Sequence, residues 1–316
     1  MLISASIGVC LWGTEFCDGD ALLQAADSAV YKAKAAGRGR CAAYDASMAT
    51  RDRYRREIGA NLRGALDGHE FTIAFQPIVA LRDRACIGFE SLARWNHPIL
   101  GAVSPTDFIP VAEEMGLIGE IGEWVLRQAC DQLAVWRSVH GLTNIKISVN
   151  VSPQQMVDPE FASLVAAALK ESNLDPRCIA LELTETAIFD ARDHGNRTLE
   201  ALRRIGTPIM LDDFGTGFSS LTHLQRVRMD ALKIDQSFVR GANGGFESAP
   251  IVETLIALAK TLGIDVVAEG VESERQAALL TTLGCQFAQG YLFSRPLSAS
   301  EALEFLLDRP AVAAER

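Results

Sequence analysis

From about residue 71 onward, short runs rich in β-branched and aromatic residues alternate with stretches whose apolar residues recur every three or four positions. The runs predict strands at 71–79, 85–93, 144–151, 178–185, 207–213, 229–235, 265–270 and 286–291. The stretches predict helices at 121–136, 161–170, 199–204, 251–262, 274–283 and 300–307. About eight strands that alternate with helices predict an α/β fold, a TIM-like (β/α)8 barrel.

The connection between the first two predicted strands differs from the others. Only a few residues, around positions 81–84, separate these strands. A parallel crossover needs about a dozen residues or more. We therefore expect the first strand to run antiparallel to the rest of the barrel.

The first 70 residues form a separate pattern. Residues 1–46 predict a strand, a helix and a short strand, which are too few elements for an independent core. The stretch that follows is charged on one side and apolar at Ile58, Leu62 and Leu66, as in a linking helix. The expected organisation is a small incomplete α/β fragment at 1–46, a linker helix at 47–70, a barrel at 71–308 and a disordered tail at 309–316.

Composition narrows the choice of partners. With 316 residues, 48% of them hydrophobic, the chain can bury a large core. Its length fits one barrel of roughly 250 residues with an appendage. The formal charge of -10 and the lack of a long basic block argue against duplex nucleic acid as a partner. Seven widely spaced cysteines without a Cys-x-x-Cys pair predict a reduced, cytoplasmic protein. No apolar run reaches about 18 residues, so we expect no membrane segment in this chain.

Polar head groups stand where the predicted strands end. They belong to Glu90, Asn150, Glu182, Asp212 with Asp213, Lys233, Glu269 and Gln289. Because the carboxyl-terminal ends of barrel strands meet at one rim, we expect these side chains to converge on one site. A single polar residue at a strand end is more often a cap or a turn former, but several in register favour a site.

The donor types of these residues indicate a metal site. Carboxylates and the amide of Asn150, without histidine or cysteine, suit Mg²⁺ or Mn²⁺ better than zinc. If the chain turns at the strand end, Asp212 and Asp213 can both reach the site, and one can bridge two ions about 4 Å apart. Such a pair would activate water for in-line attack on phosphorus, which predicts phosphodiester hydrolysis. A glycosidase on the same barrel would explain neither Asn150 nor the excess of acids.

Lys233 and Glu185 each have two interpretations, and Arg94 has one specific use. Lys233 could orient the attacking water or neutralise the transition state, or it could only form an ion pair. Glu185 could hydrogen-bond the loop that carries Asp212 and Asp213, or it could cap a helix. Arg94 offers a planar fork that matches two phosphate oxygens.

Two other patterns are weak candidates for a site. GTGFSS, at 215–220, follows a strand as a dinucleotide fingerprint would, but Ser220 replaces the third glycine. His97 and His223 stand apart from any serine or cysteine nucleophile pattern, so we interpret them as packing or loop residues.

Several segments carry a family resemblance: FQPIV, FESLARWNHP, SPTDFIPVAEEMGLIGEIGEWVLRQAC, SVNVSPQQ, LELTET, LDDFGTGFSSL, LKIDQSFV, VVAEGVE and AQGYLFSRP. Over roughly residues 71–303 they resemble the EAL-domain family, bacterial phosphodiesterases that hydrolyse cyclic di-GMP to linear pGpG. Two positions depart from the family pattern. The signature reads Glu90-Ser91-Leu92 instead of Glu-Ala-Leu, and Phe218 stands where the family often has tyrosine.

The resemblance implies hydrolysis of cyclic di-GMP with two Mg²⁺ or Mn²⁺ ions. It implies metal ligands at Glu90, Asn150, Glu182, Asp212 and Asp213, a catalytic and water-positioning pair at Lys233 and Glu269, a loop-stabilising residue at Glu185, and substrate contacts at Gln76, Arg94 and Gln289. It also implies a homodimer through the barrel, since residues 213–220 resemble the family's dimer-linked control loop. The alternative is a catalytically silent cyclic di-GMP receptor, but silent members usually lack metal ligands.

Residues 1–46 carry a second resemblance. SASIGV and ADSAVYKAKAAGRGRCAAYD resemble the carboxyl-terminal end of a GGDEF (diguanylate cyclase) domain. The signature loop and the nucleotide-binding portion of such a domain are absent, so we expect no cyclase activity. Either the natural chain is longer or this one is a truncated reading frame.

Overall fold

The computed structural model describes residues 4–13, 18–35, 37, 39–189, 192–214, 228–240 and 249–308. The chain divides into two compact units, Met1–Gly68 with Val103–Met115, and His69–Ala102 with Gly116–Arg316. The predicted tail at 309–316, the GTGFSS motif, Phe218 and His223 lie outside the described residues.

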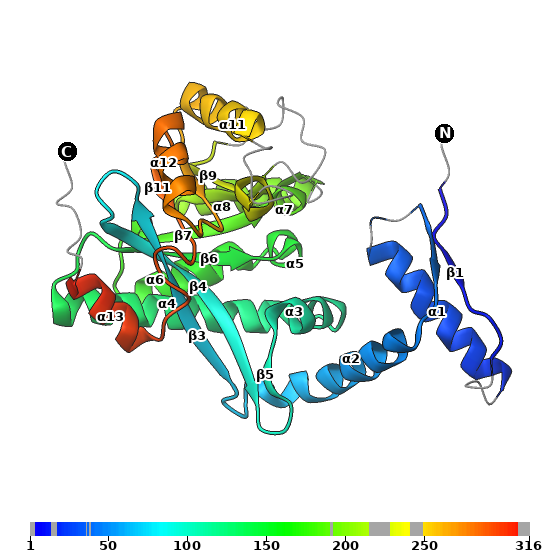
Figure 1. Cartoon of the computed structure of the whole chain (residues 1–316). Helices are drawn as coiled ribbons and strands as arrows, with labels where there is room; N and C mark the ends of the chain where they lie inside the picture. Colours follow the sequence, from blue (N-terminus) through cyan, green and yellow to red (C-terminus); the bar gives the residue numbers. More distant parts are fainter. Residues whose placement is uncertain are drawn as a thin grey trace. The chain divides into compact units, whose positions relative to one another are not determined.

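The second unit is built on a closed barrel. Its strands are β3 (Phe71–Ala80), β4 (Cys86–His97), β6 (Lys146–Val151), β7 (Ile179–Thr184), β8 (Ile209–Phe214), β9 (Ala231–Ile234), β10 (Asp265–Ala268) and β11 (Phe287–Ala288). They follow the order β3-β11-β10-β9-β8-β7-β6-β4, and pairing of β3 with β4 closes the ring (Figure 1). Short β5 (Gly101–Val103) extends the sheet beside β4. The predicted TIM-like barrel is confirmed.

The direction of the first strand is also as predicted. β3 pairs antiparallel with both β4 and β11, whereas the described pairs from β4 and β6 round to β11 are parallel. The expectation that a strand ends at Glu90 is wrong, because β4 continues to His97. The antiparallel register with β3, from Gln76↔Glu90 to Phe71↔Trp95, supplies hydrogen bonds that let the hairpin continue past the parallel part of the barrel.

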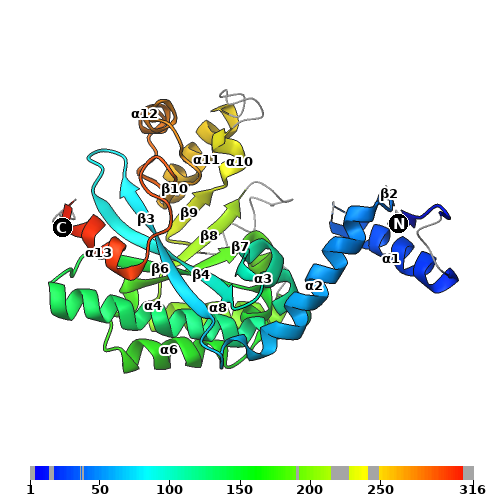
Figure 2. The ribbon, with the colours of Figure 1, turned by 60° about the horizontal axis from the view of Figure 1, so that its bottom comes forward.

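Helices surround the barrel. The longer ones are α4 (Ile118–His140), α6 (Phe161–Glu171), α8 (Arg192–Ile205), α11 (Ala249–Leu262), α12 (Glu274–Leu283) and α13 (Ala299–Asp308). Short elements follow or precede individual strands: α5 (Pro153–Val157), η1 (Pro176–Cys178), α7 (Glu185–Phe189) and α10 (Gln236–Arg240). Helices α4 and α6 lie side by side on the outside of the sheet (Figure 2).

Buried aromatic rings join α4 to the sheet. The ring of Trp136 on α4 lies 4.9 Å from that of Phe75 on β3 and 5.2 Å from that of Phe89 on β4. All three side chains are fully buried. Aromatic pairs at such separations stabilise a core beyond their buried area alone. This core lies between helix and barrel, so the inner faces of the strands are left for other residues.

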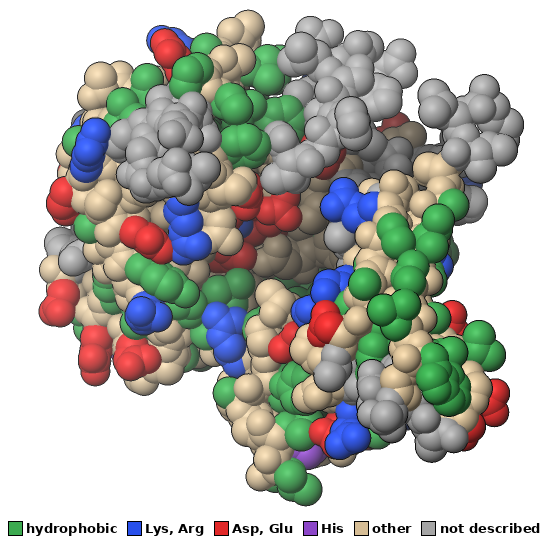
Figure 3. Space-filling model, turned by 45° about the vertical axis from the view of Figure 1, so that its right-hand side comes forward, with side chains coloured by type: hydrophobic (Ala, Val, Ile, Leu, Met, Phe, Trp, Pro, Cys, Tyr) green, Lys and Arg blue, Asp and Glu red, His purple; other side chains and the backbone are tan. Residues whose placement is uncertain are grey.

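The first unit is a small α/β assembly. It contains β1 (Ile7–Val9), α1 (Gly19–Ala35), β2 (Cys41–Ala43), α2 (Ala46–Ala65) and α3 (Pro105–Glu114), with β1 and β2 paired in parallel. The predicted linker helix is α2, which begins after Asp45, whose carboxylate accepts a hydrogen bond from the Ser47 backbone N–H at 2.9 Å. Hydrophobic side chains lie on the surface of this unit (Figure 3). The side chains of Leu11 and Trp12 are among the exposed ones. No described helix of the chain is both long and apolar enough to cross a membrane.

Candidate active site

A buried lysine lies among the carboxylates. Lys233, on β9, is inaccessible to solvent. Its Nζ atom lies 2.6 Å from Glu182, 2.6 Å from Glu269, 3.3 Å from Glu90 and 3.6 Å from Asp212. Burial opposes the charged form, but these carboxylates outweigh it and raise the pKa of Lys233 well above its ordinary value. The side chain is therefore a fixed cation, supported from β4, β7, β8 and the residue after β10.

One ammonium does not neutralise this group of acids. Burial, followed by the nearby charge of Glu90, raises the pKa of Glu182 well above its ordinary value. Burial likewise raises the pKa of Glu269 to about 7. Atom Oε1 of Glu182 is buried and has no hydrogen-bond partner among the described residues. The ion-pair interpretation of Lys233 thus fits its contacts but leaves negative charge and an unused ligand atom in the site.

Asp212 and Asp213 come together through a local turn. Asp213 has a φ of 54°, in the left-handed region, and the β8–β9 register shifts between Leu211 and Phe214. Aspartate tolerates this conformation better than most residues. As a result, ligand oxygens of Asp212, Asp213 and Glu269 lie within 4.8 Å of one another. Burial and the adjacent charge of Asp212 raise the pKa of Asp213, so a bound cation would find closely spaced hard oxygen donors.

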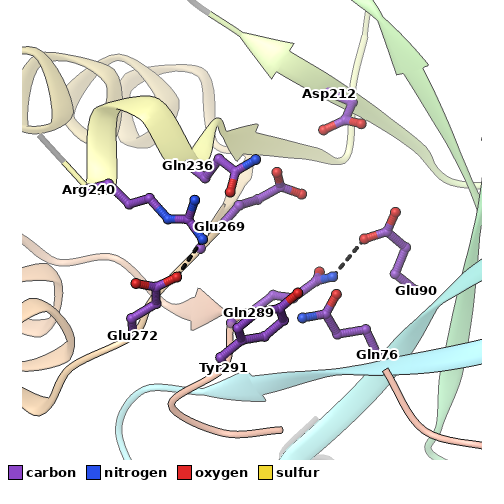
Figure 4. Close-up of a pocket in the computed structure, with 11 residues that line it drawn as sticks. Gln76, Glu90, Asp212, Gln236, Arg240, Glu269, Glu272, Gln289 and Tyr291 are labelled. Carbon is purple, nitrogen blue, oxygen red and sulfur yellow. Dashed lines mark hydrogen bonds and ion pairs between the residues drawn. The ribbon is translucent and has the colours of Figure 1, made fainter. Parts of the chain in front are cut away.

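Amide side chains fix the position of Glu90. Its Oε1 accepts a hydrogen bond from Asn150 Nδ2 at 2.7 Å, and its Oε2 accepts one from Gln289 Nε2 at 2.7 Å. Burial opposes ionisation, but Lys233 and these two amides lower the pKa of Glu90. Gln76 lies opposite Glu90 in the β3–β4 register. Figure 4 shows Gln76, Glu90 and Gln289 facing one cleft.

The cleft has a volume of about 260 Å³. Five predicted site residues line it: Gln76, Glu90, Asp212, Glu269 and Gln289. The other described residues that line the cleft were not identified from the sequence: Gln236, Arg240, Gly270, Glu272, Gly290 and Tyr291 (Figure 4). All six follow shortly after Lys233, Glu269 or Gln289, in helix α10 or in the loops at the same rim. Loops after barrel strands carry active-site residues, so their position was an available signal.

Comparison with known proteins identifies the family. Residues 60–296 match the EAL domain family. This chain belongs to that family. It is 38% identical over 301 residues to "Bifunctional diguanylate cyclase/cyclic di-GMP phosphodiesterase MucR" of Pseudomonas aeruginosa, a match that covers 95% of this chain and 44% of MucR. It is 36% identical over 296 residues to "Cyclic di-GMP phosphodiesterase PdeR" of Escherichia coli, covering 94% of this chain and 44% of PdeR.

A solved structure gives the same assignment. The structure titled "PaMucR Phosphodiesterase, c-di-GMP complex" has a TM-score of 0.75 and 39% sequence identity, and the match covers 78% of this chain and 99% of that one. The present chain spans less than half the length of MucR and PdeR.

The serine in the EAL signature lies away from the cleft. Ser91 is buried, and its hydroxyl donates a hydrogen bond to the Ser148 carbonyl at 2.7 Å. Neighbouring residues of a strand face opposite sides, so Glu90 faces the site and Ser91 the surrounding shell. The departure from the Glu-Ala-Leu signature therefore changes packing and does not remove a site residue.

Three other predicted residues lie at the edge of the site or outside it. Glu185 begins α7, and its Oε2 is buried with no hydrogen-bond partner among the described residues. The segment at 215–220 that it was expected to support is not described. Arg94 lies four residues along β4 from Glu90 but outside the cleft lining, and burial lowers its pKa. The packing role of His97 is confirmed, since its Nδ1 accepts hydrogen bonds from the Ile99 and Leu100 backbone N–H groups at 3.2 and 3.0 Å.

Proposed function

We propose that this chain is a metal-dependent phosphodiesterase that hydrolyses cyclic di-GMP to linear pGpG. The observation that carries the proposal is the excess of carboxylates around one buried ammonium at the carboxyl-terminal rim of an EAL barrel. The activities after which MucR and PdeR are named, and the cyclic di-GMP complex of the MucR phosphodiesterase, support cyclic di-GMP as the substrate.

The residues present fit divalent cations. We assign Glu90, Asn150, Glu182, Asp212 and Asp213 as ligands of two Mg²⁺ or Mn²⁺ ions. The unpartnered Oε1 of Glu182 and the oxygen-only donor set support this assignment. When bound, such ions supply an activated water and neutralise charge on the phosphate oxygens.

Lys233 and Glu269 act on the reacting groups in this proposal. Contacts with Glu182 and Glu269 hold the ammonium of Lys233 in a fixed place, so it can stabilise developing negative charge without reorganising. Glu269 lies at the cleft surface, where its carboxylate would accept a hydrogen bond from the attacking water and orient it. Glu185 would act indirectly, by hydrogen bonds to the loop after β8.

Substrate binding needs donors that overcome the negative charge of the protein. The chain carries a formal charge of -10, which repels an anionic dinucleotide at long range. We assign Gln76, Arg94 and Gln289 as substrate contacts. The two glutamines line the cleft, and Arg94 offers a fork for a phosphate group.

Two further proposals concern organisation. We propose a homodimer through the barrel, as the resemblance of residues 213–220 to the family's dimer-linked loop implies. We also propose that residues 1–46 are the carboxyl-terminal end of a GGDEF domain. The match with MucR supports this second proposal, since it covers 95% of the chain and so reaches well before residue 60, where the EAL match begins.

The test is incubation of the purified chain with cyclic di-GMP and Mg²⁺ or Mn²⁺, with chromatography and mass spectrometry to detect pGpG. We expect hydrolysis that excess chelator abolishes. Ca²⁺ should inhibit, because it is larger and prefers more ligands and longer distances. Binding of cyclic di-GMP without cleavage in either metal would instead identify a silent receptor.

A further inference from the structure

Helix α4 has a notch at Gly122, where α5 contacts it. A Cβ atom at position 122 would lie 2.3 Å from Gln155 Nε2 and 2.8 Å from Gln155 Cδ and Oε1. These distances are too short for any side chain larger than that of glycine. Glycine within a helix is less favourable than alanine. The presence of glycine here is therefore explained by the side chain of Gln155, which occupies the notch.

The side chain in the notch also caps α5. Gln155 is only 7% exposed. Its Oε1 accepts hydrogen bonds from the Ser152 backbone N–H at 3.0 Å and from the Ser152 hydroxyl at 3.1 Å. The Gln155 backbone N–H donates a hydrogen bond to Ser152 Oγ at 3.3 Å, which completes a capping box. Gln155 thus fixes both the backbone and the side chain of Ser152.

The capped residue lies directly after the strand that carries a proposed metal ligand. Strand β6 ends at Val151, and Asn150 precedes it. Asn150 Nδ2 donates a hydrogen bond to Glu90 Oε1 at 2.7 Å, so Oδ1 is the atom of this amide that can bind a cation. A shift of the chain at Ser152 would move this oxygen relative to the carboxylates. Metal affinity depends on how neighbouring groups orient the ligands.

We propose that Gln155, packed against Gly122, is a positioning residue of the metal site. It fixes the turn from β6 to α5 and thereby the orientation of Asn150. Neither Gln155 nor Gly122 is among the described residues that line the cleft, so their influence on a bound ion is transmitted through the chain. The inference rests on the proposed metal-dependent function. It makes metal affinity depend on a residue of α4, outside the barrel.

The test measures Mn²⁺ binding to the full chain, without substrate, by electron paramagnetic resonance of the free ion. Gly122→Ala adds one methyl group where Gln155 lies and should weaken Mn²⁺ binding by about tenfold to a hundredfold. Gly119→Ala is the matched control on the same helix, because a Cβ atom there would meet nothing within 4 Å. Alanine favours a helix over glycine, so this control should fold and bind Mn²⁺ as the wild type does.

Variants of Gln155 separate positioning from a purely structural role. Gln155→Ala removes the acceptor and should weaken Mn²⁺ binding by about tenfold to a hundredfold. Gln155→Glu keeps an acceptor oxygen at a position where capping boxes accept glutamate, so its affinity should stay within about threefold of the wild type. Addition of Gly122→Ala to Gln155→Ala should cause no further loss, because both substitutions act through the same contact.

Hydrolysis of cyclic di-GMP gives a second measurement. Gly122→Ala and Gln155→Ala should raise the Mn²⁺ concentration that gives half the maximal rate, and saturating Mn²⁺ should return the rate close to that of the wild type. A capping role alone would change stability and leave both Mn²⁺ measurements unaltered. Circular dichroism in chelator checks that each variant is folded, and Gln155→Ala replaces Gly122→Ala if that variant does not fold.

The outcomes distinguish this inference from the proposed function on which it rests. Wild-type Mn²⁺ affinity in folded Gly122→Ala or Gln155→Ala would overturn the positioning role and leave the phosphodiesterase proposal standing. So would a loss in Gly119→Ala equal to that in Gly122→Ala, or a loss in Gln155→Glu equal to that in Gln155→Ala. A wild-type chain that binds no Mn²⁺ would overturn both.

Discussion

Lys233 determines the charge balance of the site at the scale of single residues. It is a fully buried cation with four carboxylates within 3.6 Å of its Nζ atom. Removing one partner of a buried ion pair costs about 3–5 kcal/mol, because the remaining charge stays buried and unpaired. We therefore expect Lys233 to contribute both to stability and to catalysis. Added metal should separate the two roles, because it can replace the lost positive charge in the fold.

Lys233→Met should lower the free energy of unfolding by about 3–5 kcal/mol in the presence of a chelator. Mg²⁺ or Mn²⁺ should restore part of the loss, because ions that bind only the folded state supply the missing positive charge. Urea denaturation with and without metal measures both effects. Lys260→Met, at an exposed position of α11, is the control and should change stability by no more than about 0.5 kcal/mol. Equal losses in the two variants would contradict the account.

The loops after the strands set the geometry of the cleft at the scale of elements. Gly270 follows Glu269, has a φ of +64° and lies against α10. A Cβ atom at this position would lie 2.4 Å from Gln236 Cβ. The glycine is therefore required both by its backbone conformation and by the close approach of a neighbouring element.

Gly270→Ala should cost at least the roughly 1–2 kcal/mol of left-handed strain, and it should reduce hydrolysis by about a hundredfold through displacement of Glu269 and Gln236. Gly263→Ala separates strain from displacement. Gly263 has a φ of +69°, but a Cβ atom there would meet nothing within 4 Å. It should lose similar stability to strain and keep its rate. Steady-state kinetics and thermal unfolding of both variants test this, and a Gly270→Ala enzyme with the wild-type rate would refute it.

Local patterns predicted most elements because hydrophobic periodicity reports which face of an element is buried. Helix α12 was predicted with the bounds it has, Glu274–Leu283, where a Ser273 capping box and a left-handed Gly284 mark the ends. The full length of β4 was not predicted, because it depends on pairing with β3. The grouping of α3 with α1 and α2 was not predicted either, because it rests on contacts distant in sequence. The sequence predicted that Lys233 and the carboxylates share a site, but it could not predict their individual contacts, because these depend on closure of the barrel.

The whole molecule combines an EAL barrel with a smaller unit. Every predicted site residue lies between Gln76 and Gln289, within the second unit, whereas β1, α1 and β2 belong to the first. Exposed apolar side chains of the first unit, such as Leu11, Trp12 and Leu23, do not contribute to the described cleft. This arrangement predicts that the amino-terminal segment is dispensable for catalysis.

A chain that begins at Asp45 should hydrolyse cyclic di-GMP with an unchanged metal requirement. Asp45 is kept because it caps α2, so that only β1, α1 and β2 are removed. Removal of the exposed apolar residues should also improve solubility. Activity and light scattering compare this chain with the full one. Loss of activity in a folded, metal-loaded shorter chain would show that the segment contributes to the site or its dimer.

The most direct test of the central claim is the rate of pGpG formation from cyclic di-GMP at saturating Mg²⁺ or Mn²⁺, measured for the wild type, Glu90→Gln and Ser91→Ala. Glu90 accepts hydrogen bonds within the carboxylate cluster, whereas Ser91 faces the surrounding shell. We predict hydrolysis by the wild type, a loss of more than about a hundredfold in folded Glu90→Gln, and a rate for Ser91→Ala close to that of the wild type. A Glu90→Gln variant with near-normal turnover, or a wild type that binds cyclic di-GMP and never cleaves it, would contradict the claim.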